Sequence, residues 1–280
     1  MTKKEVEGEV AMPGVFHDLS KRLSMSSGII LMLVISFFGA DYWPVQFLTV
    51  LFVATISMAA MIEYVALVKY KGDPPSKYLL ASIGVFWPVA FFLFPSWIWL
   101  ILLFLGFFIY NFLFIDGAIY RIATGSFAML YILVPIGMIL SILYPEGVGS
   151  KGNVALVLYL VAVTKVADIG GYFMGRLFGK RKLAPKISPS KTIVGAIFGL
   201  MCSLVVSVVF ASYINITTFE AIFLGLVLGV VAELGDLAES VLKRDAHVKD
   251  SNQIPGLGGV LDLIDSLLFT TPILFAYFRF

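Results

Sequence analysis

Residues 232–266 read AELGDLAESVLKRDAHVKDSNQIPGLGGVLDLIDS and place many charged side chains between two segments apolar enough to lie in a bilayer. Charges at membrane depth are costly and tend to mark functional sites. Asp262 and Asp265 are three residues apart, so both carboxylates share one face of a helix. The turn at residues 255–259, PGLGG, would bring this acidic helix back beside the preceding one. Carboxylates that face each other in a low-dielectric setting repel unless cations lie between them, so the stretch predicts two paired membrane helices with a metal site.

The composition of the whole chain agrees with a membrane protein. Of its 280 residues, 60% are hydrophobic and 14% are charged, whereas about 25% of the residues in a soluble domain are charged. We therefore expect an all-α polytopic membrane protein that lies in a lipid bilayer, with no large soluble domain and no nucleic-acid partner. The single cysteine, Cys202, and two histidines are too few for a disulfide framework or for a Cys- or His-ligated metal centre.

Apolar segments follow one another along almost the whole chain. A membrane-spanning helix needs about 20 residues, with a range of about 17–25. The segments lie at residues 26–40, 45–68, 78–94, 97–115, 122–144, 153–175, 193–214, 219–242 and 258–279. Because the first segment is short, nine spans are the preferred count and eight are the alternative.

Lysine and arginine are distributed unevenly over the connecting loops. Almost all of them lie in one alternate set, which comprises the N-terminal tail and the loops 69–77, 116–121, 176–191 and 243–249. The other set holds only Lys151, in the loops 41–44, 95–96, 144–152 and 215–218. Cytoplasmic loops carry the excess of positive charge. Nine spans therefore place the N-terminus and both charged stretches in the cytoplasm, with the protein in the inner, cytoplasmic membrane of the cell.

These patterns divide the chain into three regions. Residues 1–27 are polar and predict a cytoplasmic tail without a cleaved signal peptide. Residues 28–150 carry few polar groups in their apolar segments and predict a transmembrane scaffold. Residues 151–280 hold both charged stretches and predict the catalytic region at the cytoplasmic side.

Two further features are interpreted as structural. Glu63 lies near the end of the second apolar segment, where we expect it to pair with Lys69 or Lys71 at the membrane interface. Small residues four apart let helix backbones approach closely in lipid. We interpret three such pairs as helix packing, namely Gly171/Gly175, Gly195/Gly199 and Gly225/Gly229.

A second polar stretch, residues 165–192, reads KVADIGGYFMGRLFGKRKLAPKISPSKT. Lys165 and Asp168 are three apart and can pair within a span. Six basic residues lie within 176–191, which is more than membrane orientation needs, although an ordinary positive loop is the alternative. Residues 188–192 lead into the next apolar segment, and the amides and hydroxyls at the start of that helix suit a phosphate. A nucleotide-hydrolysing G-x-x-x-x-G-K-[ST] loop is not supported here.

Together the two stretches indicate one kind of chemistry. A carboxylate cluster that holds divalent metal, opposite a basic loop, can neutralise charge on phosphates during phosphoryl or nucleotidyl transfer. A phosphomonoester is already anionic, so as a nucleophile it needs positioning and charge cancellation rather than a strong base. The ends of membrane spans are where a lipid headgroup and a soluble nucleotide could meet.

At these residues the sequence resembles the phosphatidate cytidylyltransferases, also called CDP-diacylglycerol synthases. Their signature runs Ser, Lys-Arg, Lys-Asp, Pro-Gly-His-Gly-Gly and Leu-Asp-Arg-x-Asp. The chain matches it at Ser240, Lys243-Arg244, Lys249-Asp250, Pro255-Gly256-Leu257-Gly258-Gly259 and Leu261-Asp262-Leu263-Ile264-Asp265. The block from Asp168 to Thr192 also fits, and the match covers about residues 164–270. Leu257 and Leu263 depart from the signature, because they stand where it usually has His and Arg.

The resemblance implies the reaction CTP + phosphatidate → CDP-diacylglycerol + pyrophosphate, with Mg²⁺ and a second, monovalent cation in the acidic cluster. The sequence leaves the oligomeric state open, with a homodimer as one assembly. The metal ligands that the resemblance implies are Asp236, Asp262 and Asp265, with Asp168 as a further ligand or a structural acid. The catalytic residues that the resemblance implies are Asp236, Lys243, Arg244, Lys249, Asp262 and Asp265. The substrate-binding residues that it implies are Arg176, Lys180, Lys182, Ser188, Ser190, Lys191, Thr192 and Ser240. Glu233 and Glu239 are expected to be structural or to support the ligands.

Two other functions compete with this interpretation. A CTP-dependent polyprenol or phytol kinase has a similar overall plan, but its acceptor is an alcohol, and the long block at residues 243–259 favours the cytidylyltransferase. An ion-coupled transporter would use buried acids as a cation site. It predicts internal repeats and acids near the bilayer midplane, whereas these acids crowd towards one end of the spans, beside a basic loop.

Overall fold

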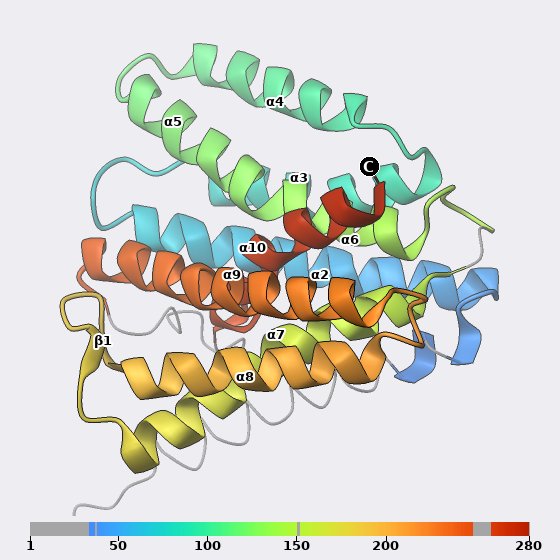
Figure 1. Cartoon of the computed structure of the whole chain (residues 1–280). Helices are drawn as coiled ribbons and strands as arrows, with labels where there is room; N and C mark the ends of the chain where they lie inside the picture. The colour runs from blue at the N-terminus through green and yellow to red at the C-terminus, as the bar shows by residue number, and fades with distance from the viewer. Residues whose placement is uncertain (1–33, 37, 150–151, 249–258, 280) are drawn as a thin grey trace, which may run out of the picture.

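The computed structural model describes residues 34–36, 38–149, 152–248 and 259–279 (Figure 1). The predicted tail 1–27, Lys151, Lys249 and the turn with Leu257 lie outside the described residues. The described α-helices are α2 (Trp43–Val68), α3 (Lys77–Leu93), α4 (Ile98–Tyr110), α5 (Ala118–Ala128), α6 (Val134–Leu143), α7 (Val154–Phe178), α8 (Ile193–Phe210), α9 (Thr218–Asp245) and α10 (Val260–Arg279).

The helices confirm an all-α membrane architecture at the coarse level. In the part of the chain that is described, six helices are long and apolar enough to cross a bilayer: α2, the continuous helix Ala118–Leu143, and α7 to α10. α3 has 17 residues, at the lower end of the range for a span, and α4 has 13, which is below that range. The first predicted segment, 26–40, lies mostly outside the described residues. The count of nine spans therefore stays a prediction.

The helix Ala118–Leu143 contains one irregular turn. α5 and α6 are joined by a π-helical turn, Met129–Leu133, and Pro135 follows it at the start of α6. Proline lacks an N–H, and its ring clashes with the carbonyl four residues back. Pro135 therefore explains why the helix is wound more widely at this turn. The carbonyl of Leu133 accepts a hydrogen bond from the Trp87 indole, with nitrogen and oxygen 2.9 Å apart. This bond fixes the turn against α3.

The loops gather at two opposite ends of the bundle, as Figure 1 shows. At one end, Lys71 of the α2–α3 loop pairs with Asp245 at the end of α9 at 3.0 Å, and Arg121 at the start of α5 pairs with Asp73. At the other end, the Gly149 amide donates to the Gln46 side chain at 2.9 Å. The basic loops therefore share one end, as the alternation of lysine and arginine predicts.

Glycines set the spacing of the helices around the site. α7 packs on α8, α8 on α9, and α9 on α10. A Cβ atom on Gly195 of α8 would lie 2.5 Å from the carbonyl oxygen of Gly171 of α7. A Cβ atom on Gly235 of α9 would lie 2.9 Å from the carbonyl oxygen of Asp265 of α10. The packing role predicted for the glycine pairs is confirmed for the α7–α8 contact and, at Gly225/Gly229, for the α8–α9 contact.

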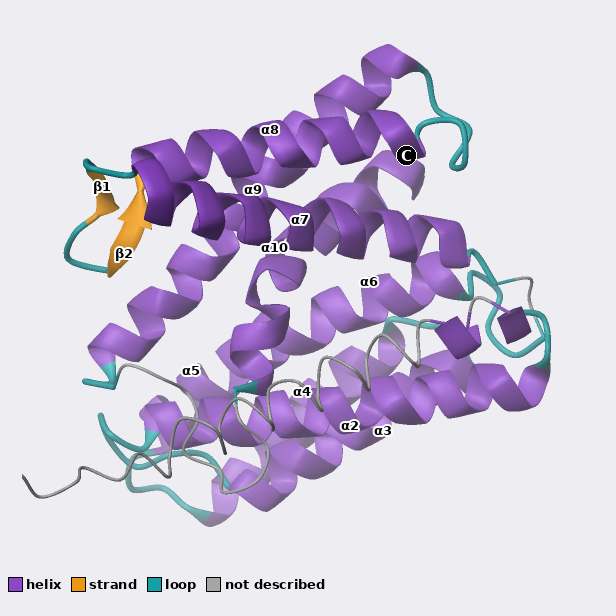
Figure 2. Cartoon of the chain, turned by 90° about the horizontal axis from the view of Figure 1, so that it is seen from below, coloured by secondary structure: helices purple, strands orange, loops and turns teal. Residues whose placement is uncertain are grey.

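α10 lies at the centre of the assembly and joins its two halves. It contacts α9 and α7 on one side and α6 and α2 on the other. In Figure 2 it lies between the layer of α7, α8 and α9 and the layer of α2 and α3. The buried apolar core is continuous across these layers, with Trp87, Leu160, Leu224 and Leu268 among its members. The acids at the start of α10 are therefore held by helices from both the N-terminal and the C-terminal half of the chain.

Candidate active site

A short β-hairpin forms the edge of the site. Its antiparallel strands are β1 (Lys182–Ala184) and β2 (Ser188–Thr192), where the sequence indicated only a polar loop. β2 runs directly into α8, and Thr192 is the helix cap, because its hydroxyl accepts the Gly195 amide at 3.1 Å. The helix start predicted after residue 192 is confirmed.

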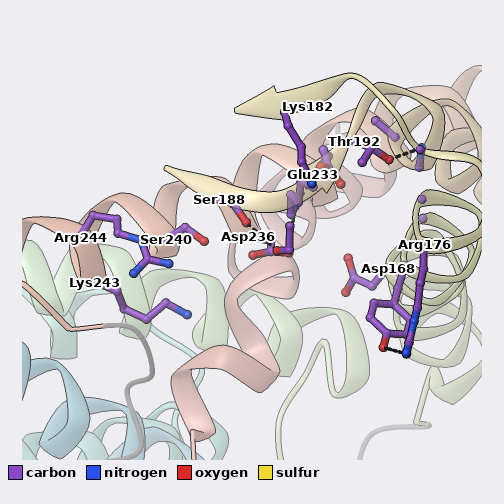
Figure 3. A pocket seen from close by; sticks show the side chains of 18 residues that line it. Asp168, Arg176, Lys182, Ser188, Thr192, Glu233, Asp236, Ser240, Lys243 and Arg244 are labelled. Atoms are coloured by element: carbon purple, nitrogen blue, oxygen red, sulfur yellow. Dashed lines mark hydrogen bonds and ion pairs between the residues drawn. The ribbon is translucent and has the colours of Figure 1, made fainter. Parts of the chain in front are cut away.

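A cavity of about 660 Å³ lies between α7, the hairpin, the start of α8 and the last turns of α9 (Figure 3). Most of the predicted site residues line it, from three separate segments of the chain. They are Asp168, Arg176, Lys182, Ser188, Ser190, Lys191, Thr192, Asp236, Ser240, Lys243 and Arg244. Three predicted residues, Lys180, Asp262 and Asp265, do not line it, and Lys249 lies outside the described residues.

The cavity wall carries more basic than acidic groups. Five of its side chains are cationic, namely Arg176, Lys182, Lys191, Lys243 and Arg244, and three are acidic, namely Asp168, Glu233 and Asp236. Figure 3 shows Asp168 and Arg176 on one side, Ser240, Lys243 and Arg244 on the other, and Asp236 and Glu233 between them. A cleft whose wall carries an excess of one sign of charge attracts ligands of the other sign. The wall therefore suits a polyphosphate.

One lysine lies between two acids at the cavity. The Lys191 ammonium is 2.9 Å from the Glu233 carboxylate and 2.9 Å from that of Asp236. Burial would lower the pKa of Lys191, but the two carboxylates outweigh burial and hold that pKa above its usual value. We call Glu233–Lys191–Asp236 the open bridge, because both of its acids are partly exposed.

A second lysine lies between two acids where α9 meets α10. Lys243 pairs with Glu239, one helical turn before it, and with Asp262 of α10 at 2.7 Å. The Glu239 side chain is 0% exposed. We call Glu239–Lys243–Asp262 the buried bridge. It links Lys243, which lines the cavity, to the predicted metal ligand Asp262, which does not.

Asp168 and Asp265 are fixed by hydrogen bonds around Ser266. Asp168 accepts from the Lys165 ammonium at 3.2 Å, which confirms the predicted i,i+3 pair, and from the Ser266 hydroxyl at 2.9 Å. Asp265 is buried and accepts from the Ser266 amide at 2.5 Å. Ser266 therefore connects an acid at the cavity wall with one in the interior of the bundle.

Two arginines are anchored so that they stay at the cavity. Arg244 Nε donates to the carbonyl of Ile187 in the hairpin turn at 3.0 Å. Arg176 donates to the Tyr172 hydroxyl at 3.0 Å, within α7. Each anchor uses only part of a guanidinium, which has five N–H donors. Both arginines thus keep donors for a ligand.

Comparison with known proteins agrees with this geometry. The model of the cytidylyltransferase family matches residues 20–280. The chain belongs to this family. Similar curated proteins include a phosphatidate cytidylyltransferase of Chlamydia trachomatis serovar D, 43% identical over 169 residues, which are 57% of this chain and 55% of that protein. Another, of Haemophilus influenzae, is 48% identical over 134 residues, 45% of this chain and 46% of that protein. The chain thus matches about half the length of these relatives.

The donor set of this family member suits a hard cation, but the acids are not gathered around one point. Carboxylate oxygens are the ligands that Mg²⁺ prefers. Within the described ranges, no three acidic, histidine or cysteine side chains lie close enough together to hold a metal ion. Asp236 and Asp262 instead face lysine ammoniums. The cations that the sequence places between its carboxylates are, in this conformation, its own lysines, and the metal ligands stay a prediction.

The sequence interpretation of Glu63 was wrong. We expected it to pair with Lys69 or Lys71 at the membrane interface. Glu63 is instead 0% exposed, and its carboxylate accepts hydrogen bonds from the backbone amides of Val260 and Leu261. The apolar neighbours of Glu63 in the sequence could not reveal this contact, because its partners lie almost two hundred residues later. A buried carboxylate needs strong donors, and the start of α10 supplies them.

Two more residues of this region are Leu263, on α10, and Tyr131, on the π-helical turn. Leu263, which replaces the usual arginine, packs against the hydrophobic core. Tyr131, on the π-helical turn, was not predicted; its buried hydroxyl has no hydrogen-bond partner among the described residues, and its ring packs against Phe269 of α10 with centroids 6.2 Å apart. π-turns often occur at functional sites, which is the one signal for Tyr131 and appears only in the structure.

Proposed function

We propose that the chain is a phosphatidate cytidylyltransferase that converts CTP and phosphatidate into CDP-diacylglycerol and pyrophosphate. The observation that carries the proposal is the cavity. It joins the basic wall of α7 and the hairpin to the two acids and two basic residues of α9, at the end of the bundle where the basic loops gather. Family membership and the names of the curated relatives support the same reaction.

The reaction needs one bond to form and one to break. An oxygen of the phosphatidate phosphate attacks the α-phosphorus of CTP, and the bond from that phosphorus to the oxygen bridging to the β-phosphate breaks. Pyrophosphate leaves with the bonding electrons. The attacking phosphate is already anionic, so no side chain has to remove a proton, and the protein contributes position and charge.

The residues of the cavity divide this work by their location. Arg176, Lys182 and Lys191 with the hydroxyls of the hairpin would bind the triphosphate. Lys243, Arg244 and Ser240, on the opposite side in Figure 3, would bind the phosphate of the lipid. Arginines make paired, geometrically fixed bonds to phosphate oxygens, and lysines act as point charges. This arrangement holds the two anions close together despite their repulsion.

Mg²⁺ is part of the proposal. Asp236 lines the cavity and would hold the ion together with Asp262 and Asp265, or with Asp168 across the cavity. When bound, the ion would neutralise charge on the nucleotide phosphates. Because Asp236 and Asp262 contact lysines in this structure, holding a metal requires these contacts to rearrange. A second, monovalent cation in the same cluster is a further proposal that follows from the family resemblance.

The orientation is inferred from charge. The end of the bundle with the hairpin carries the basic loops, and positive loops face the cytoplasm. We therefore place the site at the cytoplasmic face of the inner membrane. Soluble CTP reaches the site there, and phosphatidate enters from the adjacent leaflet.

The test is an assay of the purified protein in detergent with phosphatidate, labelled CTP and Mg²⁺. We expect CDP-diacylglycerol and pyrophosphate in equal amounts, and no product in excess chelator. Asp262→Asn should lose activity by about 100-fold or more while it extracts and unfolds like the wild type. Phosphorylation of a polyprenol or phytol from CTP instead would establish the kinase. The mass of the protein in the detergent complex tests the proposed homodimer.

A further inference from the structure

We propose that Glu63, in the scaffold half of the molecule, is a positioning residue for the site, because it holds the first turn of α10 and with it Asp262. This inference rests on the proposed function and adds a residue to it. Glu63 lies on α2, which contributes no residue to the cavity wall. Its effect must therefore pass through α10.

The contact itself is specific. One Glu63 carboxylate oxygen accepts the Val260 amide at 2.9 Å, and the other accepts the Leu261 amide at 2.7 Å. These are the first two residues of α10. The first amides of a helix have no partner within the helix, and in a membrane protein each unsatisfied one is costly. Glu63 thus caps α10 from another helix, with a charge that also suits the positive end of the helix dipole.

The chain offers no equally good cap within α10 itself. The residue before the helix is Gly259, with φ +66°, and glycine has no side chain to accept an amide. A Cβ atom at this position would lie 3.1 Å from the Asp262 carboxylate, so a capping side chain would crowd that acid. The carboxylate of Glu63 supplies the cap from outside and leaves the space beside Asp262 open.

The capped amides lie in the same helical turn as Asp262. Asp262 follows Leu261 directly and accepts from Lys243 at 2.7 Å, and Lys243 lines the cavity. If the first turn of α10 frays, Asp262 moves and Lys243 loses one of its two acids. The triphosphate wall on α7 and the hairpin has no part in this chain of contacts. Loss of Glu63 should therefore reduce kcat and spare the binding of CTP.

The experiment compares Glu63→Gln and Glu63→Ala with a matched control, Gln46→Ala. Gln46 is also a buried polar residue of α2 and also holds a backbone amide, that of Gly149. It lies 17 residues away, about 25 Å along the helix, at the opposite end of the bundle. Gln46→Ala thus reports the general effect of deleting a buried polar contact from α2.

Two measurements are made on each variant in detergent. In steady-state kinetics, we expect both Glu63 variants to lower kcat by about 10- to 100-fold, with KM for CTP near the wild-type value, and Gln46→Ala to keep both constants. In hydrogen exchange, we expect faster exchange of the amides at 260–262 in both Glu63 variants, with unchanged protection of α8 and α9. Glu63→Gln keeps the shape of the side chain, so it gives the answer if Glu63→Ala does not fold.

The outcomes separate this inference from the proposed function. Unchanged exchange at 260–262, or a kcat equal to that of Gln46→Ala, overturns the role of Glu63. Faster exchange with a raised KM for CTP and an unchanged kcat also overturns it, because the defect would then lie in the triphosphate wall. If the wild type transfers no cytidylyl group, the proposed function fails, and the exchange of residues 260–262 still decides whether Glu63 caps α10.

Discussion

The open bridge and the buried bridge use the same three charges in different surroundings. In each, one lysine ammonium contacts two carboxylates. The acids of the open bridge are 27% and 32% exposed, and its lysine comes from the hairpin, outside the helix that carries the acids. In the buried bridge Glu239 is 0% exposed, and the lysine lies on the same helix as that acid. One bridge faces a cavity, and the other joins two helices.

The difference concerns what replaces the lysine when it leaves. Around Glu233 and Asp236, water or a ligand cation can take its place, so the open bridge can rearrange when substrate and metal bind. Neither water nor a ligand cation reaches Glu239, because its side chain is 0% exposed, and breaking a buried ion pair leaves an uncompensated charge. We infer that Lys191 is the mobile lysine of the site and that Lys243 is a fixed one. The predictions below test this distinction.

The largest expected effect follows from Lys243→Met. It removes the cation from Glu239 and should lower the free energy of unfolding by about 3–5 kcal/mol, with loss of activity because Lys243 lines the cavity. Thermal unfolding in detergent measures the first effect. The double variant Lys243→Met/Glu239→Leu should recover most of the stability and none of the activity, because an apolar pair can replace a buried ion pair. A loss of stability no greater than that of Lys191→Met would contradict the distinction.

The sequence predicts the helices that carry the site and the contacts between residues close together in the chain. The helices α7 to α10 follow from apolar segments of the right length, and the site residues on them follow from charges next to those segments. Lys165 and Asp168 pair as their spacing predicts, because i,i+3 contacts are local. The lysine ammoniums that contact Asp236 and Asp262 were not predicted, and the metal site predicted for these carboxylates stays a prediction.

What the sequence missed depends on contacts between distant segments. Lys191 reaches Glu233 only because the hairpin folds back over α9, and the hairpin itself is short and polar, with Pro185 and Pro189, so it has no clear strand pattern. Glu63 was interpreted from its nearest lysines, whereas its partners are on α10. Local patterns predict local partners, and the groups that join the two halves of this molecule are not local.

A smaller effect on stability and a large one on activity are expected for Lys191→Met. Its acids are partly exposed, so the free energy of unfolding should fall by only about 1 kcal/mol. The same change removes a cation from the proposed triphosphate wall, and kcat/KM for CTP should fall by about 100-fold. Lys191→Arg keeps the charge and should retain more activity than Lys191→Met. Thermal unfolding and initial rates on the same preparations check both, and a stability loss as large as that of Lys243→Met would refute the open bridge as a mobile contact.

The smallest expected effect is the pH dependence of the open bridge. The pKa of Lys191 is raised above its usual value of 10.5 because its two acids outweigh burial. When folding raises the pKa of a lysine, that lysine stabilises the folded state fully at pH values below its pKa in the unfolded chain. This stabilisation is lost as the pH rises through its pKa in the folded protein. The stability difference between wild type and Lys191→Met should therefore be constant from about pH 7 to 9 and should shrink only above 10.5. Unfolding curves of the two proteins across this range measure it. A difference that shrinks below pH 9 would mean that the acids do not hold Lys191 in its charged form, and that the open bridge is weaker than its distances indicate.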